Sequence, residues 1–398
     1  MKLISGNAKV VRNINRAVIL NIIRTKQPIS RVKIAKLTGL NKSTVSSIVS
    51  DLLLEEIISE QVKADQNVGR NPLDIYLRSG KYLVGAINID AALTRFAIVD
   101  VDGTVLITSE IDTKPQNPTE FVEYCMDQLF ILCEQKKINS LYGLGVSIAG
   151  IVDPNKLVVK FAPNLGWENF DIGSVIKRKW PDVNLLAIGN DAKSSALAEL
   201  WFGTQGVPLS DFVFLSVGPG LGAGIVVDRK ILEGETHASG EFGHMIIFEG
   251  GEMCVCGNHG CWETYASDRA TVKRYIARKQ TSSQQSIDLV IEDIVELAKL
   301  GDSTAIEVLK QTGYYLGLGL VNIIKSIDPR AIIMGGKIIQ AWDIIYPEIM
   351  NVVKLRAFFG NKEKSTLILP TTLKIRPRLL GAATLAIKEI FEDYKIVT

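Results

Sequence analysis

Three cysteines lie within eight residues of one another, at Cys254, Cys256 and Cys261. Thiolate sulfur suits Zn²⁺, and a tetrahedral zinc site needs about four nitrogen or sulfur ligands. The fourth ligand is expected to be His244 or His259, because all the histidines of the chain lie close to this cluster. The chain has five cysteines, an odd number that disfavours a disulfide framework. We therefore predict one structural zinc ion per chain; cysteines that are simply buried or redox-active are the alternative.

A second set of chemically active residues lies in the stretch that follows Leu40. Apolar residues recur there at helical spacing, at Val45, Ile48, Val49 and Leu52. A rotation of about 100° per residue places small hydroxyl side chains and a lysine on the opposite face. Such a face can bond to bases and phosphates in the major groove of DNA. The predicted DNA-binding residues are Arg31, Asn41, Lys42, Ser43, Thr44, Ser46, Ser47 and Arg70.

The charge distribution also favours a nucleic-acid partner at the start of the chain. Residues 1–80 contain 13 basic and 6 acidic side chains, a net charge of +7, whereas residues 81–398 contain 32 basic and 37 acidic side chains, a net charge of −5. A basic module joined to a mildly acidic one indicates binding to a polyanion. The 398 residues, 47% hydrophobic and 22% charged, are typical of a globular protein with two or three domains.

The helix with the hydroxyl face needs neighbours that hold it, and residues 1–80 supply them. Val11, Ile14, Val18 and Ile22 predict an amphipathic helix that ends before Gln27-Pro28. A short helix follows between a Ser30 cap and Gly39, with Val32, Ile34, Ala35 and Leu37 as its apolar positions, and Asn41 caps the third helix. Two alternating segments, 57–62 and 73–77, predict a hairpin with Arg70 near its tip. We expect a winged helix-turn-helix; a dimerisation or protein-docking module is the alternative.

From residue 81 onward the sequence alternates between strands and helices. Strands are expected at 82–89, 95–99, 105–107 and 144–148, with a helix at 121–135, and again at 212–217, 224–227 and 331–334, with helices near 286–300 and 304–325. The two halves are similar, which predicts a duplicated α/β fold that closes around a cleft. We expect one lobe to comprise residues 81–190 plus the C-terminal helix, and the other to comprise 191–380.

Several segments of this body resemble the ROK family of repressors, open reading frames and sugar kinases. The resemblance rests on the segments 145–153, 162–167, 189–192, 240–244 and 254–263, and covers essentially the whole chain. It implies a winged helix in front of a two-lobed, actin-like or RNase H-like sugar-kinase body. Within the family, the segment 40–46 is most similar to the xylose repressors.

The resemblance implies which residues bind sugar and metal. It selects His244, rather than His259, as the fourth zinc ligand beside the three cysteines. It implies that a sugar is bound by Asn164, Asn190, Asp191, Glu241, His244 and Glu263, whose amides, carboxylates and imidazole suit adjacent hydroxyls. One ring nitrogen of His244 could bind zinc while the other bonds a sugar hydroxyl.

The same comparison predicts that phosphoryl transfer has been lost. ROK kinases carry an Asp-x-Gly-Gly-Thr turn whose bare backbone approaches the phosphates of ATP, but this chain has Asn88-Ile89-Asp90-Ala91-Ala92 there. Pro219 stands where a threonine is usual, and Lys337 replaces a glycine after Gly335-Gly336. Asp191, which matches the family's general base, remains, and sugar binding alone explains it. We expect no ATP cofactor.

These features predict a sugar-responsive transcriptional repressor that binds double-stranded operator DNA as a homodimer. The expected effector is a monosaccharide, in the order xylose, glucose, then another aldose or an N-acetylated sugar. An active sugar kinase that also binds DNA, a repressor controlled by a protein partner, and an activator are the alternatives. No apolar run is long enough to span a bilayer and no signal-peptide segment is evident, so a cytoplasmic protein is expected.

Overall fold

The computed structural model describes residues 8–62, 73–205, 209–279, 289–357, 366–374 and 376–392. Its N-terminal unit has three helices and a two-stranded antiparallel sheet, as a winged helix requires. These elements are α1 (Ala8–Lys26), α2 (Arg31–Thr38), α3 (Lys42–Leu54), β1 (Ile58–Val62) and β2 (Leu73–Leu77). The predicted tip of the wing, with Arg70, lies outside the described residues.

The short polar segments between these helices end and begin them as predicted. Ser30 caps α2, since its hydroxyl accepts a hydrogen bond from the Lys33 N–H at 3.4 Å. Gly39 ends α2 in the left-handed conformation with φ 72°, which costs glycine little. Asn41 caps α3 by accepting from the Thr44 N–H at 2.7 Å. The predicted core of α3, Val45, Ile48, Val49 and Leu52, is buried.

The predicted apolar face of α1 is buried only in part, at Ile22, which packs against the core. Val11, Ile14 and Val18 are exposed by 48%, 42% and 43%, and the core instead receives Ala17, Ile19, Leu20 and Ile23. Helix α1 carries apolar residues on two faces, and packing against α2, α3 and β2 buries the second one. In α2, likewise, Val32 and Leu37 are exposed while Ile34 and Ala35 are buried.

The first lobe of the body is built on a five-stranded sheet in the order β10-β6-β3-β4-β5. Strands β3, β4 and β5 form an antiparallel meander, β6 pairs in parallel with β3, and β10 pairs in parallel with β6. The elements of this lobe are β3 (Val84–Ile89), β4 (Leu93–Val99), β5 (Val105–Asp112), α4 (Pro118–Gln135), β6 (Gly143–Ile148), β7 (Ile151–Asp153), β8 (Val158–Ala162), β9 (Trp167–Phe170), α5 (Ile172–Lys179) and β10 (Leu186–Asn190). Strands β7, β8 and β9 form a separate small sheet.

The second lobe repeats this topology, with the order β13-β12-β11-β14-β15. Again three strands form an antiparallel meander, a fourth pairs in parallel with the first of them, and a fifth pairs in parallel with the fourth. Its elements are β11 (Phe212–Val217), β12 (Leu221–Val227), β13 (Lys230–Ile231), the 3-10 helix η1 (Phe242–His244), α7 (Glu263–Ala266), α8 (Asp268–Lys279), α9 (Ile291–Lys299), α10 (Ser303–Ile327), β14 (Ala331–Gly335), the 3-10 helix η2 (Lys337–Ala341), α11 (Trp342–Arg356) and β15 (Leu367–Pro370). The predicted duplication is confirmed by this matching strand order.

Two helices, α6 (Asp191–Phe202) and α12 (Pro377–Phe391), join the lobes. Helix α12 packs on β3 and β6 of the first lobe, α6 packs on β11 and β12 of the second, and the two helices pack on each other. Glycines allow this close approach. A Cβ at Gly145 would lie 1.8 Å from the Ala382 carbonyl oxygen, and one at Gly381 would lie 2.4 Å from the Ser194 backbone.

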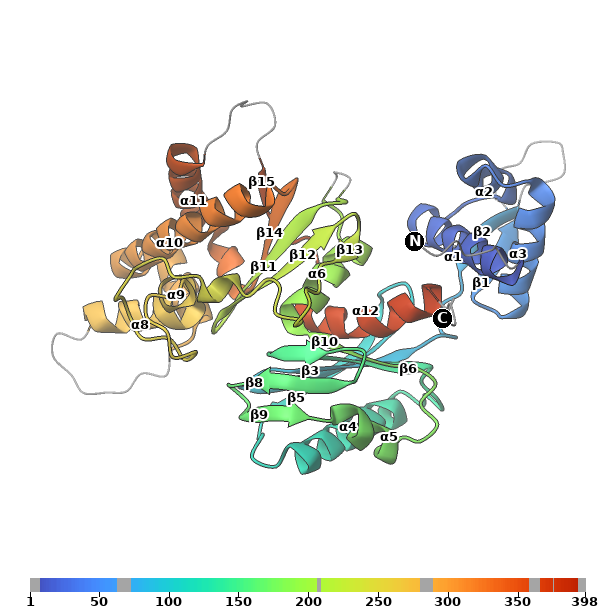
Figure 1. The fold of residues 1–398 in the computed structure, drawn as a ribbon, viewed down its shortest axis with the longest axis horizontal. Coiled ribbons are helices and arrows are strands. Elements are labelled where there is room, and N and C mark those ends of the chain that lie inside the picture. The colour runs from blue at the N-terminus through green and yellow to red at the C-terminus, as the bar shows by residue number, and fades with distance from the viewer. Residues whose placement is uncertain are drawn as a thin grey trace.

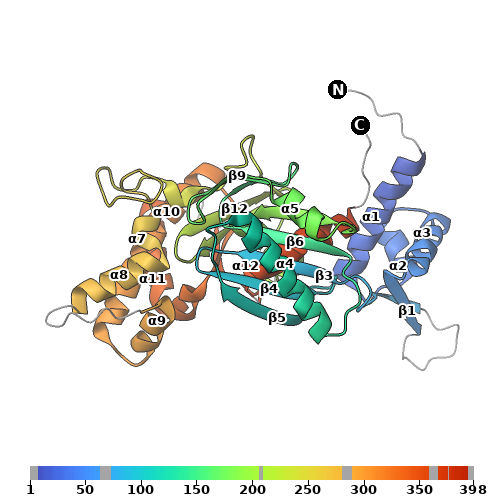
Figure 2. The same ribbon diagram turned by 90° about the horizontal axis from the view of Figure 1, so that it is seen from below.

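The winged helix packs against the body at the C-terminal ends of these two helices. Figures 1 and 2 show it at one end of the molecule, beside α12, with α8 at the opposite end. One hydrophobic cluster runs from the winged-helix core through Leu380 and Ile387 to Phe391 of α12. Arg24 of α1 donates to the Trp201 carbonyl of α6 at 2.8 Å and stacks over the Trp201 ring, 4.0 Å from its centroid.

We propose domain boundaries near residues 80 and 190, because the sheets of the winged helix and the two lobes change there. Among the described helices, none has both the length and the apolar character needed to cross a membrane.

Candidate functional site

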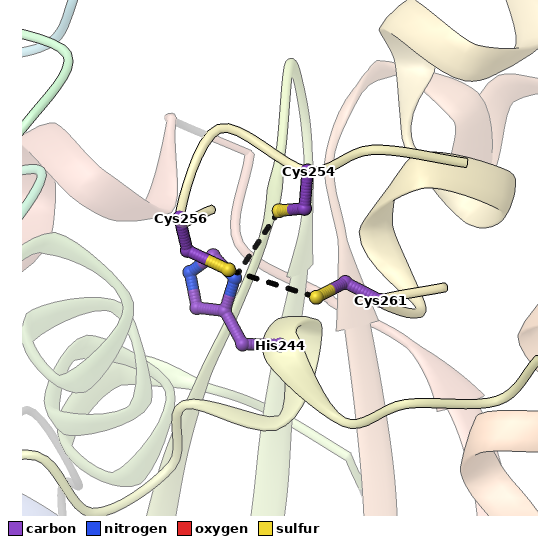
Figure 3. Close-up of side chains that lie close together, drawn as sticks. All are labelled: His244, Cys254, Cys256 and Cys261. Atoms are coloured by element: carbon purple, nitrogen blue, oxygen red, sulfur yellow. Dashed lines mark hydrogen bonds between the residues drawn. The ribbon is translucent and has the colours of Figure 1, made fainter. Parts of the chain in front are cut away.

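The side chains of His244, Cys254, Cys256 and Cys261 point toward one common position (Figure 3). Their ligand atoms all lie within 4.8 Å of one another. The Cys254 sulfur is 3.6 Å from His244 Nδ1, and the Cys256 and Cys261 sulfurs are 3.7 Å apart. A tetrahedron with Zn–S bonds of about 2.3 Å has sulfur–sulfur edges of about 3.8 Å. The spacing and the donor set therefore fit a zinc ion.

The loop that carries the cysteines is shaped by its own backbone. The Cys254 N–H donates to the Asn258 carbonyl at 2.8 Å, and the Gly257 N–H donates back to the Cys254 carbonyl at 3.0 Å. Burial acts to raise the pKa of Cys256, but hydrogen bonds from the Asn258 N–H and from the neighbouring thiols hold it below its ordinary value. Burial instead raises the pKa values of Cys254 and Cys261, so without a cation a thiolate is favoured at Cys256 alone.

His259 lies away from the cluster, although sequence reasoning from the residues alone left it open as a ligand. It is exposed, and its Nδ1 lies 3.0 Å from the Gly251 carbonyl oxygen. The choice of His244 that the resemblance implied therefore agrees with this geometry.

His244 links the cysteine cluster to two carboxylates. Its Nδ1 faces Cys254 and lies 3.7 Å from Glu263, whereas its Nε2 lies 3.8 Å from Glu241. Nδ1 is therefore the nitrogen available to a metal, and Nε2 is turned toward the Glu241 carboxylate. Glu263 is 6% exposed and also accepts a long hydrogen bond from the Leu221 N–H at 3.4 Å.

Asn190 and Asp191 lie at the N-terminus of α6, on the other side of the predicted sugar site. Asn190 caps the helix, since its Oδ1 accepts from the Ala192 and Lys193 N–H groups at 2.9 and 3.0 Å. Its Nδ2 donates to the Gly150 carbonyl at 3.0 Å, which leaves one amide N–H for a ligand. Asp191 is 6% exposed, and burial raises its pKa while Arg378 opposes that rise.

Strand β12 brings these two groups of residues together. Its Gly222 lies against α6, where a Cβ would be 2.8 Å from Ala192, and its Leu221 carbonyl lies against Gly243 of η1. Glu241 is close enough to Asp191 and Glu263 for their charges to repel one another. Five of the six predicted sugar-binding residues thus border one region. The sixth, Asn164, is exposed in the turn between β8 and β9 and, among the described residues, makes no hydrogen bond to the other five.

The residues of the predicted phosphate loops surround a single cavity of about 470 Å³ between the lobes. Asn88 and Asp90 line it from the first lobe, and Gly218, Pro219 and the segment 335–337 line it from the second. Asn88 donates to the Ser147 hydroxyl at 3.0 Å and is 1% exposed. The cavity also contains Arg378, which sequence reasoning missed because no local motif distinguishes it.

The predicted DNA-binding residues fall into two groups. Lys42, Ser43 and Ser47 are exposed on α3, and Thr44 and Ser46 are partly exposed. Four of these residues also have contacts within the winged helix. Asn41 caps α3, and the Arg31 guanidinium pairs with Glu60 at 2.7 Å. The Ser43 hydroxyl donates to Asn41 Oδ1 at 2.8 Å, and the Ser47 hydroxyl accepts from Arg12 at 3.0 Å. Arg70 lies outside the described residues.

Comparisons with known proteins cover the whole chain. It is 31% identical over 391 residues to the xylose repressor of Bacillus spizizenii, covering 97% of this chain and 98% of that protein. It is 29% identical to the N-acetylglucosamine repressor of Escherichia coli O6:H1, covering 89% of each.

Solved structures similar to this chain include both a transcriptional regulator and a sugar kinase. A ROK family transcriptional regulator described as a homologue of the Escherichia coli MLC protein matches with a TM-score of 0.81 and 26% identity, over 96% of this chain and 97% of that one. A ROK family glucokinase from Streptomyces griseus, solved with glucose and AMPPNP, matches with a TM-score of 0.69 and 27% identity, over 77% of this chain and 99% of its own. The ROK family model matches residues 84–389, and the chain belongs to the ROK family.

Proposed function

We propose that this protein is a transcriptional repressor that releases its operator when a monosaccharide binds between the lobes. One observation carries the proposal: a winged helix packs directly on the two helices that join the lobes of a sugar-kinase-like body. The full-length similarity to a protein named xylose repressor supports the same conclusion. A binding site whose occupation moves α6 or α12 would move the DNA-binding unit.

We infer that the body has lost phosphoryl transfer. Backbone N–H groups at glycine turns bind phosphates because nothing but bare backbone lines the approach. Here Asp90 stands in the first turn where the kinases carry a glycine, Arg378 fills the space beside Gly218 of the second turn, and Pro219 removes one N–H donor from that turn. The filled approach and the missing donor disfavour ATP. A coupled assay for sugar-dependent ADP release should therefore give no signal above a blank.

The cysteine and histidine cluster would hold one zinc ion through three sulfurs and His244 Nδ1. Bound zinc would supply a fixed positive charge that closes the cysteine loop. The chain's own contribution is then to fix the orientation of the His244 ring, so that Nε2 faces the sugar site beside Glu241. Folding of the loop and sugar binding would thereby depend on the same residue.

The effector is expected to be a neutral monosaccharide. Relatives are named for xylose and for N-acetylglucosamine, and a structural neighbour was solved with glucose. The relative named for xylose covers 97% of this chain and the one named for N-acetylglucosamine covers 89%, so we place D-xylose first, D-glucose second and N-acetyl-D-glucosamine third. A thermal-shift series with these sugars tests the order, since a ligand that binds only the native state raises the melting temperature.

Helix α6 provides a physical connection between sugar and DNA. Asn190 and Asp191 stand at its N-terminus, and Trp201, near its C-terminus, contacts Arg24 of the winged helix. A displacement of α6 on sugar binding would shift α1. In a homodimer, half-sites about 34 to 36 Å apart demand a fixed spacing of the recognition helices, so a shift of a few ångströms would weaken operator binding.

Operator release is tested with DNA that the protein itself selects. Duplexes enriched from a random pool serve as operator, and binding is followed by fluorescence anisotropy with and without each sugar. Sugar-dependent loss of binding is expected. If a sugar binds without any effect on DNA, control by a protein partner becomes the better explanation, and tighter binding with sugar would favour an activator.

A further inference from the structure

Arg378 is a largely enclosed cation in the cavity between the lobes. It stands in the first turn of α12, and its side chain is 19% exposed. Its guanidinium reaches Asp90 at 2.6 Å, Asp191 at 3.2 Å and the Ser216 hydroxyl at 3.1 Å. These partners belong to the first lobe, to α6 and to the second lobe, so one side chain connects all three parts.

The guanidinium also occupies the space directly beside the second glycine turn. A Cβ at Gly218 would lie 2.9 Å from Arg378 Nη2. That bare backbone is where a phosphate group would approach in a nucleotide-binding relative. Here the approach is filled by an internal cation, and Asp268 adds a further carboxylate whose charge acts on it.

The backbone of Arg378 is fixed by a buried polar chain. The Ser147 hydroxyl donates to the Arg378 carbonyl at 3.0 Å, and Asn88 donates to the same hydroxyl at 3.0 Å. Both Asn88 and Ser147 are nearly inaccessible, with exposures of 1% and 0%. The start of α12 is therefore held in one place, and the side chain is aimed at the two aspartates.

We propose that Arg378 is a positioning residue for sugar recognition, which orients Asp191 as a hydrogen-bond acceptor and ties the Asp90 turn to α6. This inference rests on the proposed role of Asp191 in binding sugar. Asp191 is almost wholly buried, and a buried carboxylate without a cationic partner is costly. Because Arg378 contacts Asp191 from the side of the former nucleotide site, it can act on the sugar only through that carboxylate.

A double-mutant cycle tests this indirect action. The ligand is whichever of D-xylose, D-glucose and N-acetyl-D-glucosamine raises the melting temperature of the full-length protein. Calorimetry then measures the affinity of the wild type, Arg378→Met, Asp191→Asn and the double variant for that sugar. Arg378→Met is expected to weaken sugar binding about 10- to 100-fold in the wild-type background. In the Asp191→Asn background the same change should alter affinity less than about threefold.

Two further variants separate positioning from general structural damage. Arg378→Lys keeps the charge and should recover most of the lost affinity. Arg376→Met removes a similar charge two residues away, where the side chain is 47% exposed and pairs with Glu110, and should leave affinity unchanged within about twofold. If Arg378→Met melts at a lower temperature or loses zinc, Arg378→Gln replaces it in the cycle.

Each outcome decides one of the two claims. Equal losses from the Arg378 substitution in both backgrounds, or no loss in either, overturn the positioning role while leaving the sugar site in place. An Asp191→Asn variant that binds sugar as the wild type does contradicts the sugar site itself. So does the absence of binding by all three sugars.

Discussion

Replacement of Arg24 by alanine separates sugar binding from operator release. Arg24 of α1 contacts α6 through one hydrogen bond to the Trp201 carbonyl and stacking on the Trp201 ring. The Phe391 ring of α12 lies 5.9 Å from the same guanidinium. Arg24→Ala should leave the sugar affinity unchanged and reduce the effect of sugar on DNA.

The expected magnitude follows from the contacts that are lost. A hydrogen bond from a charged donor contributes about 1.5 to 3 kcal/mol, and a partly desolvated cation–π contact contributes about 1 to 2 kcal/mol. Desolvation offsets part of this, since burial, with the Arg229 charge, lowers the Arg24 pKa to about 10. A net loss of about 2 kcal/mol corresponds to about a 30-fold weaker attachment of the winged helix to α6.

The assay measures operator affinity by anisotropy at zero and saturating sugar, together with sugar affinity by calorimetry. Wild-type coupling in allosteric proteins is about 5- to 150-fold, and Arg24→Ala should reduce it below about threefold. Lys26→Ala is the matched control, because Lys26 is a basic residue exposed at the end of the same helix. It should retain the wild-type response.

Full sugar response in Arg24→Ala would refute this reasoning, because the signal would then reach the DNA-binding unit by another contact. A parallel loss of sugar affinity would also count against it, since Arg24 lies at the opposite end of α6 from Asp191.

Three other predictions concern the metal, the DNA and a buried acid. Elemental analysis of the wild type, purified without chelator, should find one zinc per chain, and Cys256→Ser should abolish it; a variant that retains zinc would contradict the proposed His244 and three-cysteine ligand set. Ser47→Ala should weaken binding to the operator more than binding to random-sequence DNA, whereas Lys42→Ala should weaken both and reduce the salt dependence of binding. If Ser47→Ala weakens binding to both DNAs equally, the assignment of base contacts to α3 is wrong. Burial raises the pKa of Asp268 from 3.8 to about 7, so the folded state binds its proton more tightly than the unfolded state, and stability should fall as pH rises from about 4 to about 7. Asp268→Asn should therefore raise the free energy of unfolding at pH 8, by at most about 4 kcal/mol, and flatten this pH dependence; a destabilised variant in denaturant titrations at pH 8 would contradict the assignment.

Local signals in the sequence were enough for the parts whose structure is decided locally. The caps Ser30 and Asn41, the stop at Gly39 and the core of α3 follow from residues within one or two turns. The buried face of α1 could not be obtained in this way, because two apolar faces compete and the tertiary packing of the winged helix buries the one with Ile19 and Ile23.

In the candidate site, too, the sequence predicts the features that are local and misses those that depend on tertiary packing. The cysteines lie within a short loop, so their spacing alone predicts a metal, while the choice of His244 over His259 depends on how the chain turns at η1. Arg378 is 187 positions from Asp191 and meets it only because α12 packs against α6. No sequence pattern within either helix predicts that contact, so it is found only in the three-dimensional structure.

The central claim is that occupation of the cleft by a monosaccharide releases the operator, and one titration tests it directly. Wild type and Asp191→Ala are bound to the selected operator, and D-xylose, D-glucose or N-acetyl-D-glucosamine is added while anisotropy is recorded. The account predicts that one sugar weakens wild-type binding at least about fivefold, and that Asp191→Ala binds the operator normally but is not released at the same concentration. Release of Asp191→Ala at wild-type sugar concentrations, or loss of its operator binding without sugar, would contradict the account.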